Sequence, residues 1–210
     1  MMSQSISEER FLRLSGLSNS TDYLRQAVRF LDEVDNDPMM WKWVVIALHG
    51  ALYGFAICAC KGTNPERVTL KPKKEKASKK QNRPRLITFD QALERCQDPN
   101  VMGLYCDSKP LVLDTNQEKA IDMLKQVLRN EFEHFIPKVW SIELLGMPAI
   151  AYHVLIVIRF LALDTGNVTY CDQQDRREVE LLVEQGKKVL SGTSLWKEFE
   201  AIGEDPTACL

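Results

Sequence analysis

The sequence carries almost no net charge, since 27 Lys and Arg stand against 29 Asp and Glu in 210 residues, a formal charge of −2. This balance excludes a field of one sign over the whole molecule, of the kind that recruits nucleic acid without a specific site. Any contact with a polyanion therefore requires a local basic patch. Hydrophobic residues make up 45% of the chain, so we expect one soluble domain over residues 1–210 with one substantial core.

A regular cysteine framework and an apolar leader are also missing. The N-terminal stretch MMSQSISEERF has no hydrophobic signal-peptide region, so we expect reduced thiols and a cytoplasmic protein. The one close pair, Cys58 and Cys60, has no second pair at zinc-finger spacing and no nearby histidine downstream. We therefore expect no metal and no cofactor, and buried free thiols among the six cysteines: Cys58, Cys60, Cys96, Cys106, Cys171 and Cys209.

Alternating strand patterns are scarce, whereas apolar residues recur at helical spacing along most of the chain. Leu24, Val28 and Leu31 predict a first helix over 20–35, with Ser20 or Thr21 as its cap. Thr88 or Asp90 is the expected cap of the third helix, and Asp114 or Thr115 that of the fourth. The predicted helices cover residues 20–35, 38–62, 88–96, 114–135, 148–164 and 172–192. Short antiparallel connections predict an all-α, up-and-down bundle.

Two predicted helices are apolar enough to raise the question of a membrane. Residues 43–60 contain no Asp, Glu, Lys or Arg, and Gly50-x-x-x-Gly54 is a spacing that lets two helices approach closely. The helix over 148–164 holds His153 and Arg159, which are costly in a bilayer. We expect soluble packing at the two glycines and no membrane contact, with a membrane span as the alternative. His49 and His153 are expected to be hydrogen-bonded histidines of the core.

Positive charge is concentrated in residues 66–85, ERVTLKPKKEKASKKQNRPR, between the first long helices. Nine Lys or Arg stand against two Glu there, so this segment carries +7 and the rest of the chain −9. The segment has no apolar face, so we expect a mobile loop. It is either a solvated connector or an arm that binds RNA phosphates without reading sequence. The residues expected to bind RNA are Lys71, Lys73, Lys74, Lys76, Lys79, Lys80, Arg83 and Arg85.

The stretch VLRNEFEHFIPKVW, residues 127–140, combines a core stripe with a polar face. The stripe recurs at spacings of three and four and consists of Ile121, Leu124, Leu128, Phe132 and Phe135. Asn130 and His134 lie on another line of the same helix, with Met123 and Val127 beside them. Arg129 is about 140° from His134 on a straight helix. An ordinary helix end, with Arg129 paired to Glu133, is the structural alternative.

This stretch resembles the R-N-x-x-x-H motif of a prokaryotic branch of HEPN domains, the higher eukaryote and prokaryote nucleotide-binding domains. The helix WKWVVIALHGALYGF resembles the first long helix of that branch, so the similarity covers roughly residues 22–190. The resemblance implies an all-α bundle and a homodimer with both motifs in one cleft. It also implies, in many members, RNA cleavage without a metal ion. Arg129 and His134 are then the paired site residues, and Asn130 is the polar residue that follows the arginine.

The residue types fit this chemistry. A neutral His134 can take the proton of a ribose 2′-hydroxyl, and Arg129 can donate two hydrogen bonds to the phosphorane oxygens. Asn130 can fix the imidazole tautomer. We therefore expect a metal-independent endoribonuclease that acts as a homodimer on RNA, as a toxin or an antiviral defence effector, with an inhibitory partner left open. The alternative is a non-catalytic helical dimer that binds a protein or a nucleotide.

Overall fold

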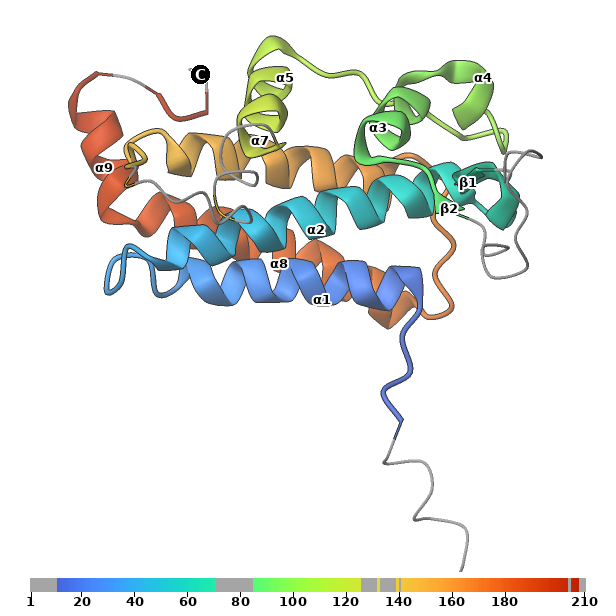
Figure 1. Cartoon of the computed structure of the whole chain (residues 1–210), viewed down its shortest axis with the longest axis horizontal. Coiled ribbons are helices and arrows are strands. Elements are labelled where there is room, and N and C mark those ends of the chain that lie inside the picture. The colour runs from blue at the N-terminus through green and yellow to red at the C-terminus, as the bar shows by residue number, and fades with distance from the viewer. Residues whose placement is uncertain are drawn as a thin grey trace, which may run out of the picture.

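Four long helices form the body of the protein. The structure, a computed structural model, describes residues 11–70, 85–125, 132, 139, 141–203 and 205–207. In it α1 (Gly16–Leu31) packs against α2 (Met40–Lys61), α2 against α7 (Met147–Arg159), α7 against α8 (Gln173–Gly192), and α8 back against α1 (Figure 1). Each helix thus covers two neighbours, and the four enclose one core. This confirms the predicted all-α class.

The helix directions depart from simple up-and-down alternation. Within the pairs α1–α2 and α7–α8 the chain reverses, whereas α2 and α7 run in the same direction (Figure 1). A long connection, residues 62–146, links α2 to α7 and brings the chain back to the end of the bundle where α2 starts. Bundles with such a crossover are a known variant of the four-helix arrangement. The alternation expected from short connections therefore holds within each pair but not between the pairs.

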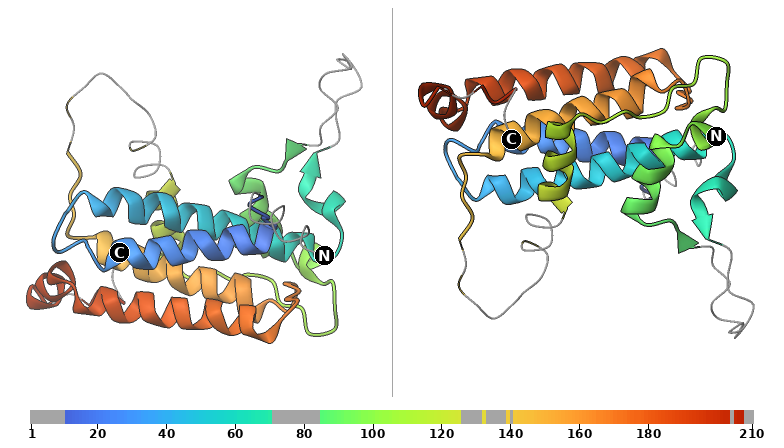
Figure 2. Two further views of the ribbon diagram at one scale, coloured as in Figure 1. Left: turned by 90° about the horizontal axis from the view of Figure 1, so that it is seen from below. Right: turned by 90° about the horizontal axis from the view of Figure 1, so that it is seen from above.

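Shorter elements cover one side and both ends of the bundle. Both views in Figure 2 place the ladder of β1 (Thr69–Leu70) and β2 (Arg85–Leu86) at the end of the bundle where α2 finishes. Helix α3 (Phe89–Gln97) lies at the same end, while α5 (Thr115–Asp122) crosses the long helices. α5 packs against α7, and α3 packs against α2. The other short elements are the 3-10 helix Pro65–Val68, α4 (Pro99–Met102), the π-helical segment Phe160–Asp164 and α9 (Ser194–Ala201).

The first helix begins earlier than its sequence predicted. Ser15 is the N-cap, because its side chain accepts from the Ser18 backbone N–H while the Ser18 hydroxyl accepts from the Ser15 N–H, a capping box. The expected caps Ser20 and Thr21 are instead buried inside the helix. The Ser20 hydroxyl donates to the Gly16 carbonyl at 2.6 Å, so this serine is satisfied within the helix and is free to face α2.

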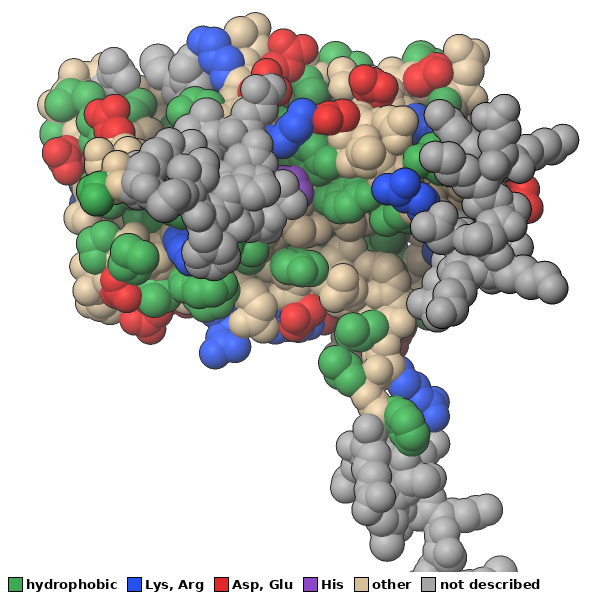
Figure 3. Space-filling view, in the orientation of Figure 1, with side chains coloured by type: hydrophobic (Ala, Val, Ile, Leu, Met, Phe, Trp, Pro, Cys, Tyr) green, Lys and Arg blue, Asp and Glu red, His purple; other side chains and the backbone are tan. Residues whose placement is uncertain are grey.

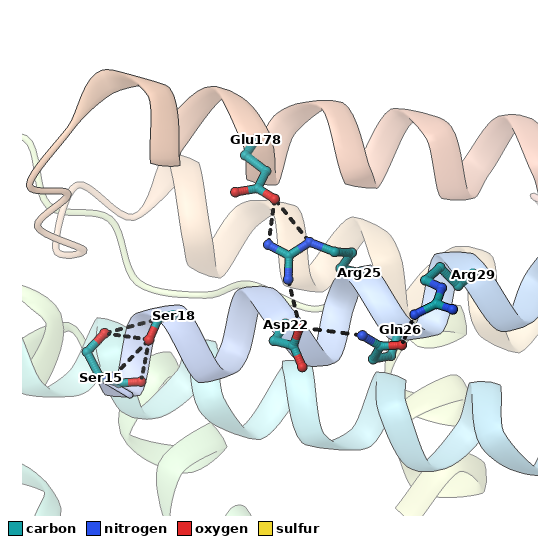
Figure 4. A network of polar contacts seen from close by, with 7 residues as sticks. All are labelled: Ser15, Ser18, Asp22, Arg25, Gln26, Arg29 and Glu178. Carbon is teal, nitrogen blue, oxygen red and sulfur yellow. Dashed lines mark hydrogen bonds and ion pairs between the residues drawn. The ribbon is translucent and has the colours of Figure 1, made fainter. Parts of the chain in front are cut away.

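A charged contact joins α1 to α8. The Arg25 guanidinium donates through Nε and Nη2 to one carboxylate oxygen of Glu178, at 3.1 and 2.6 Å, and through Nη1 to Asp22 at 2.7 Å (Figure 4). All three side chains are partly exposed, so each such pair contributes only about 0.2–1 kcal/mol. The packing of apolar faces, rather than this contact, therefore holds the two helices together.

The two apolar helices lie mainly inside the bundle. Met40–Lys61 and Met147–Asp164 are long and apolar enough to cross a membrane, but 61% and 72% of their most hydrophobic windows are buried within the molecule. A core helix of a soluble protein has the same length and composition. The location of the protein with respect to a membrane therefore stays a prediction.

The ends of the expected basic loop are ordered structure. Pro65–Val68 forms a 3-10 helix, and Thr69 and Leu70 pair with Leu86 and Arg85 in an antiparallel ladder. Val68 and Ile87 are buried on either side of this ladder. The sequence does not predict this strand pair, because strands of two residues carry no periodic pattern. The expected loop of residues 66–85 is thus shortened at both ends, and residues 71–84 lie outside the described part of the chain.

Candidate functional site

The three residues predicted to be catalytic, Arg129, Asn130 and His134, lie outside the described residues, so the structure does not report their geometry. What it does describe is the helix that leads to them. Asp114, one of the two predicted caps, is the N-cap of α5, and its carboxylate accepts from the Gln117 N–H at 2.9 Å. The Gln117 side chain accepts in return from the Asp114 N–H, which completes a capping box.

The described members of the predicted core stripe do face the core. Ile121 and Leu124 are buried, and Phe132 packs against the same hydrophobic cluster. Met123, which the sequence assigns to the other face, is 39% exposed. The division into an inward apolar stripe and an outward face is therefore confirmed at these four positions.

Residues 123–125 depart from a straight α-helix, because they have π-helical hydrogen bonding. Such turns insert an extra residue and occur often near functional sites. Lys125, in this turn, forms an ion pair with Asp90 of α3. This ion pair joins the described start of the predicted site helix to α3, which follows the basic segment in sequence.

Of the residues expected to bind RNA, the structure describes only Arg85. It lies in β2, opposite Leu70, and its side chain is exposed. Lys71, Lys73, Lys74, Lys76, Lys79, Lys80 and Arg83 lie outside the described residues. A ninth basic residue of the segment, Arg67, has a structural role: its guanidinium donates to the carbonyls of Cys60, at 3.0 Å, and Val101. Arg67 therefore joins the end of α2 to α4.

A groove of about 340 Å³ runs between α1 and α2 and continues to β2. Figure 3 shows that the middle of this face carries mainly hydrophobic and uncharged polar side chains, with charged ones toward its edges. His49 stacks on Phe89, with ring centroids 4.7 Å apart, and the Tyr53 hydroxyl donates to the Ile87 carbonyl. The residues that line the groove are Gly16, Asn19, Ser20, Tyr23, Ile46, His49, Gly50, Tyr53, Gly54, Ile57 and Leu86.

Close approach of the two helices forms the floor of this groove. A Cβ added at Gly50 would lie 2.6 Å from the nearest ring carbon of Tyr23, and one added at Gly54 would lie 2.1 Å from Ser20 Oγ. The predicted tight packing at Gly50 and Gly54 is confirmed, and it occurs between two helices of the same chain. The sequence predicts His49 to be a core histidine outside any site, whereas it is half-buried and lines this groove. Its position one residue before this glycine pair is the signal that points to the groove.

His153 differs from the hydrogen-bonded core histidine that was predicted. It is only 3% exposed, yet neither imidazole nitrogen has a hydrogen-bonding partner in the described part of the structure. The ring of Tyr152 lies edge-on to it, with centroids 5.7 Å apart. Burial lowers the pKa of His153, and the negative charge of Asp114 opposes this shift in part. A neutral, unpaired imidazole in the core is a cost to stability.

The cysteines form no metal site among the residues described, where no three His, Cys, Asp or Glu side chains gather. Cys58 and Cys60 lie two residues apart on α2 and so point about 160° apart, toward different neighbours. Cys58, Cys60 and Cys96 are buried free thiols, as predicted, whereas Cys106 and Cys171 are exposed. Cys209 lies outside the described residues.

A second hollow, of about 550 Å³, lies between residues 106–109 and 163–166. The side chain of Asn167 connects two segments near this hollow. The Asn167 amide donates to the Met102 carbonyl at 2.9 Å and its oxygen accepts from the Ser108 hydroxyl at 2.6 Å. Because these hydrogen bonds satisfy the buried amide on both sides, we assign Asn167 a structural role.

Comparisons with known proteins returned no matching family model, no matching curated protein and no matching solved structure.

Proposed function

We propose that the chain is a metal-independent endoribonuclease that acts as a homodimer, with Arg129 and His134 as its site residues and Asn130 as their polar neighbour. The observation that supports this most is the orientation of the segment around them. Phe132, between Arg129 and His134 in sequence, packs on the core, while Met123 of the opposite face is exposed. A polar motif next to an exposed apolar side chain is expected where a second copy covers the face and completes a cleft.

In this proposal His134 accepts the proton of the ribose 2′-hydroxyl, which attacks the neighbouring phosphate. Arg129 stabilises the negative charge that gathers on the phosphorane oxygens, through two parallel hydrogen bonds. Asn130 holds the imidazole tautomer. The second protomer of the dimer supplies a protonated histidine to the leaving 5′-oxygen, so that one cleft contains both a base and an acid. No metal ion is needed in this scheme.

The basic segment captures the substrate in the same proposal. Its seven positive residues between 71 and 83, with Arg85 beyond them, attract RNA phosphates regardless of base sequence. The cellular role that fits such an activity is that of a toxin or an antiviral defence effector under the control of an inhibitory partner.

The decisive test is the chemistry of the product. We expect the purified protein to cleave single-stranded RNA in excess EDTA and to leave 2′,3′-cyclic phosphate ends. His134→Ala and Arg129→Ala should each abolish cleavage while the protein stays folded and still binds RNA. His153→Leu is the matched control, because it removes a histidine from the core and should leave cleavage intact. Cleavage that stops in EDTA, or that survives His134→Ala, contradicts the proposal.

The groove between α1 and α2 favours the second candidate, a non-catalytic helical protein that binds a protein or a nucleotide. It combines an apolar floor with the polar groups of His49, Tyr53 and Asn19, as binding sites for small molecules and peptides often do. If the folded dimer leaves RNA intact under all these conditions, this candidate replaces the first.

A further inference from the structure

Cys60 and Cys96 form a close pair of thiols at the junction of α2 and α3. Cys60 lies in the last turn of α2, and Cys96 in the last turn of α3. Both residues are fully buried, and their sulfur atoms are 3.4 Å apart. A disulfide bond has a sulfur–sulfur distance of about 2.05 Å, so an approach of about 1.4 Å separates this contact from a covalent bond.

Backbone carbonyls from both helices fix the two thiols face to face. The Cys60 sulfur lies 3.4 Å from the carbonyl oxygen of Ala92, on α3. The Cys96 sulfur lies 3.6 Å from the carbonyl oxygen of Ala56, on α2. Each cysteine is thus held by the helix that carries the other one. The pairing is a property of how α2 and α3 dock and does not depend on a flexible loop.

Two arginines adjoin the pair. Arg67 donates to the carbonyl of Cys60 itself, at 3.0 Å, and Arg95, on α3, donates to the carbonyl of Arg67. The pKa of Cys60 is lowered, first by the hydrogen bond from the Cys96 thiol and then by the positive charges of Arg95 and Arg67, against the opposing effect of burial. A thiol with these neighbours forms the thiolate more easily, and the thiolate is the reactive form.

We propose that Cys60 and Cys96 are a redox site, at which a peroxide converts the two thiols into a disulfide bond between α2 and α3. The Cys60 thiolate attacks one peroxide oxygen and the O–O bond breaks, which gives a sulfenic acid and, after protonation of the leaving oxygen, water. The Cys96 sulfur then attacks the Cys60 sulfur, and the sulfenic oxygen leaves as a second water with the thiol proton. Overall the two thiols lose two electrons, and hydrogen peroxide is reduced to two water molecules.

The covalent bond would enclose the basic segment. Residues 66–85 lie between Cys60 and Cys96 in sequence, and the β1–β2 ladder lies at the end of the bundle where α2 finishes (Figure 1). Cys60 is in that last turn of α2. The disulfide would anchor both flanks of that segment to the end of α2. Because both sulfurs are buried, the reaction requires a brief local opening of α3, a helix of nine residues.

Cys58 provides an internal comparison. It is buried on the same helix, but its sulfur faces α1 near Gly16 rather than α3, and burial raises the pKa of its thiol. The exposed Cys106 and Cys171 report on general oxidation by solvent. The proposal therefore predicts that the buried pair Cys60 and Cys96 is cross-linked, while Cys58, a single buried cysteine on the same helix as Cys60, is not.

The experiment treats the folded, full-length protein with increasing hydrogen peroxide, quenches it, and alkylates it after unfolding. Peptide mass spectrometry should find a Cys60–Cys96 cross-linked pair, lighter by two hydrogen atoms and restored by dithiothreitol, while Cys58 stays fully alkylated. The proposal is overturned if Cys60 and Cys96 remain alkylated at peroxide levels that oxidise Cys106 and Cys171. It is also overturned if they cross-link mainly to other cysteines.

Two variants separate the roles of the sulfurs. With Cys96→Ser, the sulfenic acid on Cys60 has no partner and should be trapped by dimedone at Cys60. With Cys60→Ser, Cys96 should take up dimedone at least several-fold more slowly. Equal labelling of the two variants would contradict the assignment of Cys60 as the attacking thiol. Should either variant fail to fold, the cross-link map of the unmodified protein still decides whether the redox site exists.

Discussion

Replacing His153 by Leu should stabilise the protein, although most changes in a core do the opposite. The neutral imidazole has one N–H donor and one acceptor nitrogen, and neither finds a partner in the described structure. A buried polar group without a hydrogen bond costs about 1–3 kcal/mol. Leucine has a similar volume and no polar atom, so it removes this cost without leaving a large cavity.

The expected gain at pH 7.5 is therefore about 1–3 kcal/mol in the free energy of unfolding. For a chain of this size, each kcal/mol corresponds to a rise of about 2–4 °C in the unfolding temperature. The surroundings support a gain of this sign, because His153 lies on α7 among the buried Ile150, Val154 and Val157.

The advantage of leucine should grow as the pH falls. Burial lowers the pKa of His153 in the folded protein below the value of 6.5 for a free side chain. Between the folded pKa and 6.5, the unfolded chain binds a proton at this position and the folded chain does not. The wild-type protein therefore loses stability as the pH drops through this window, by at most about 1.4 kcal/mol per pH unit. The Leu variant lacks this contribution.

The assay is urea unfolding followed by circular dichroism at pH 7.5 and pH 5.5. His49→Leu is the matched control, because His49 is half-buried, stacks on Phe89 and makes further interactions. The His49→Leu variant should not gain stability at pH 7.5. If His153→Leu is less stable than wild type at pH 7.5, the imidazole has a favourable partner and the reasoning is wrong. The reasoning is also wrong if the difference in the free energy of unfolding between the two proteins is the same at both pH values.

Two further changes test the packing and the basic segment. Gly54→Ala should destabilise the protein by about 1–3 kcal/mol, because the added Cβ would lie 2.1 Å from Ser20 Oγ and 3.4 Å from Ser20 Cα. The control in thermal unfolding is Gly192→Ala, where an added Cβ meets nothing within 4 Å. Equal effects of the two substitutions would contradict the close approach of α1 and α2. Deletion of residues 71–83 should weaken RNA binding and flatten its dependence on salt, because the lysines no longer displace counterions, while thermal stability changes little. An unchanged salt slope in a fluorescence titration would show that the phosphates bind elsewhere.

Local sequence determined where several helices begin and end. Thr88 and Asp114, each one of two predicted caps, are the N-caps of α3 and α5. Such a cap depends only on a side chain and the backbone N–H three residues later. Gly62, the last residue of the predicted helix over 38–62, ends α2 with a positive φ of 52°. Apolar periodicity likewise predicted the inward faces of α1 and of the helix through Leu124, since one strip of a helix must be buried whatever covers it.

Local patterns did not predict the start of α1, the β1–β2 ladder or α9. Ser15 rather than Ser20 begins α1, because several serines and a threonine near the start offer competing caps and only the Ser15–Ser18 pair is reciprocal. The β1–β2 ladder joins residues 69–70 to 85–86, and no pattern within either dipeptide predicts that pairing. α9 follows α8 after one residue and lies outside the predicted helices.

The sequence by itself thus determined that this chain is a bundle of helices, which of their faces are apolar, and where positive charge and the R-N-x-x-x-H motif lie. Tertiary structure alone decided which side chains meet across helices. It set Cys60 against Cys96 rather than beside Cys58, left His153 without a hydrogen-bonding partner among the described residues, and stacked His49 of α2 on Phe89 of α3. The physical reason is that a side chain's partner on another helix depends on the rotation and docking of both helices. These follow from the packing of the whole core and not from any one segment.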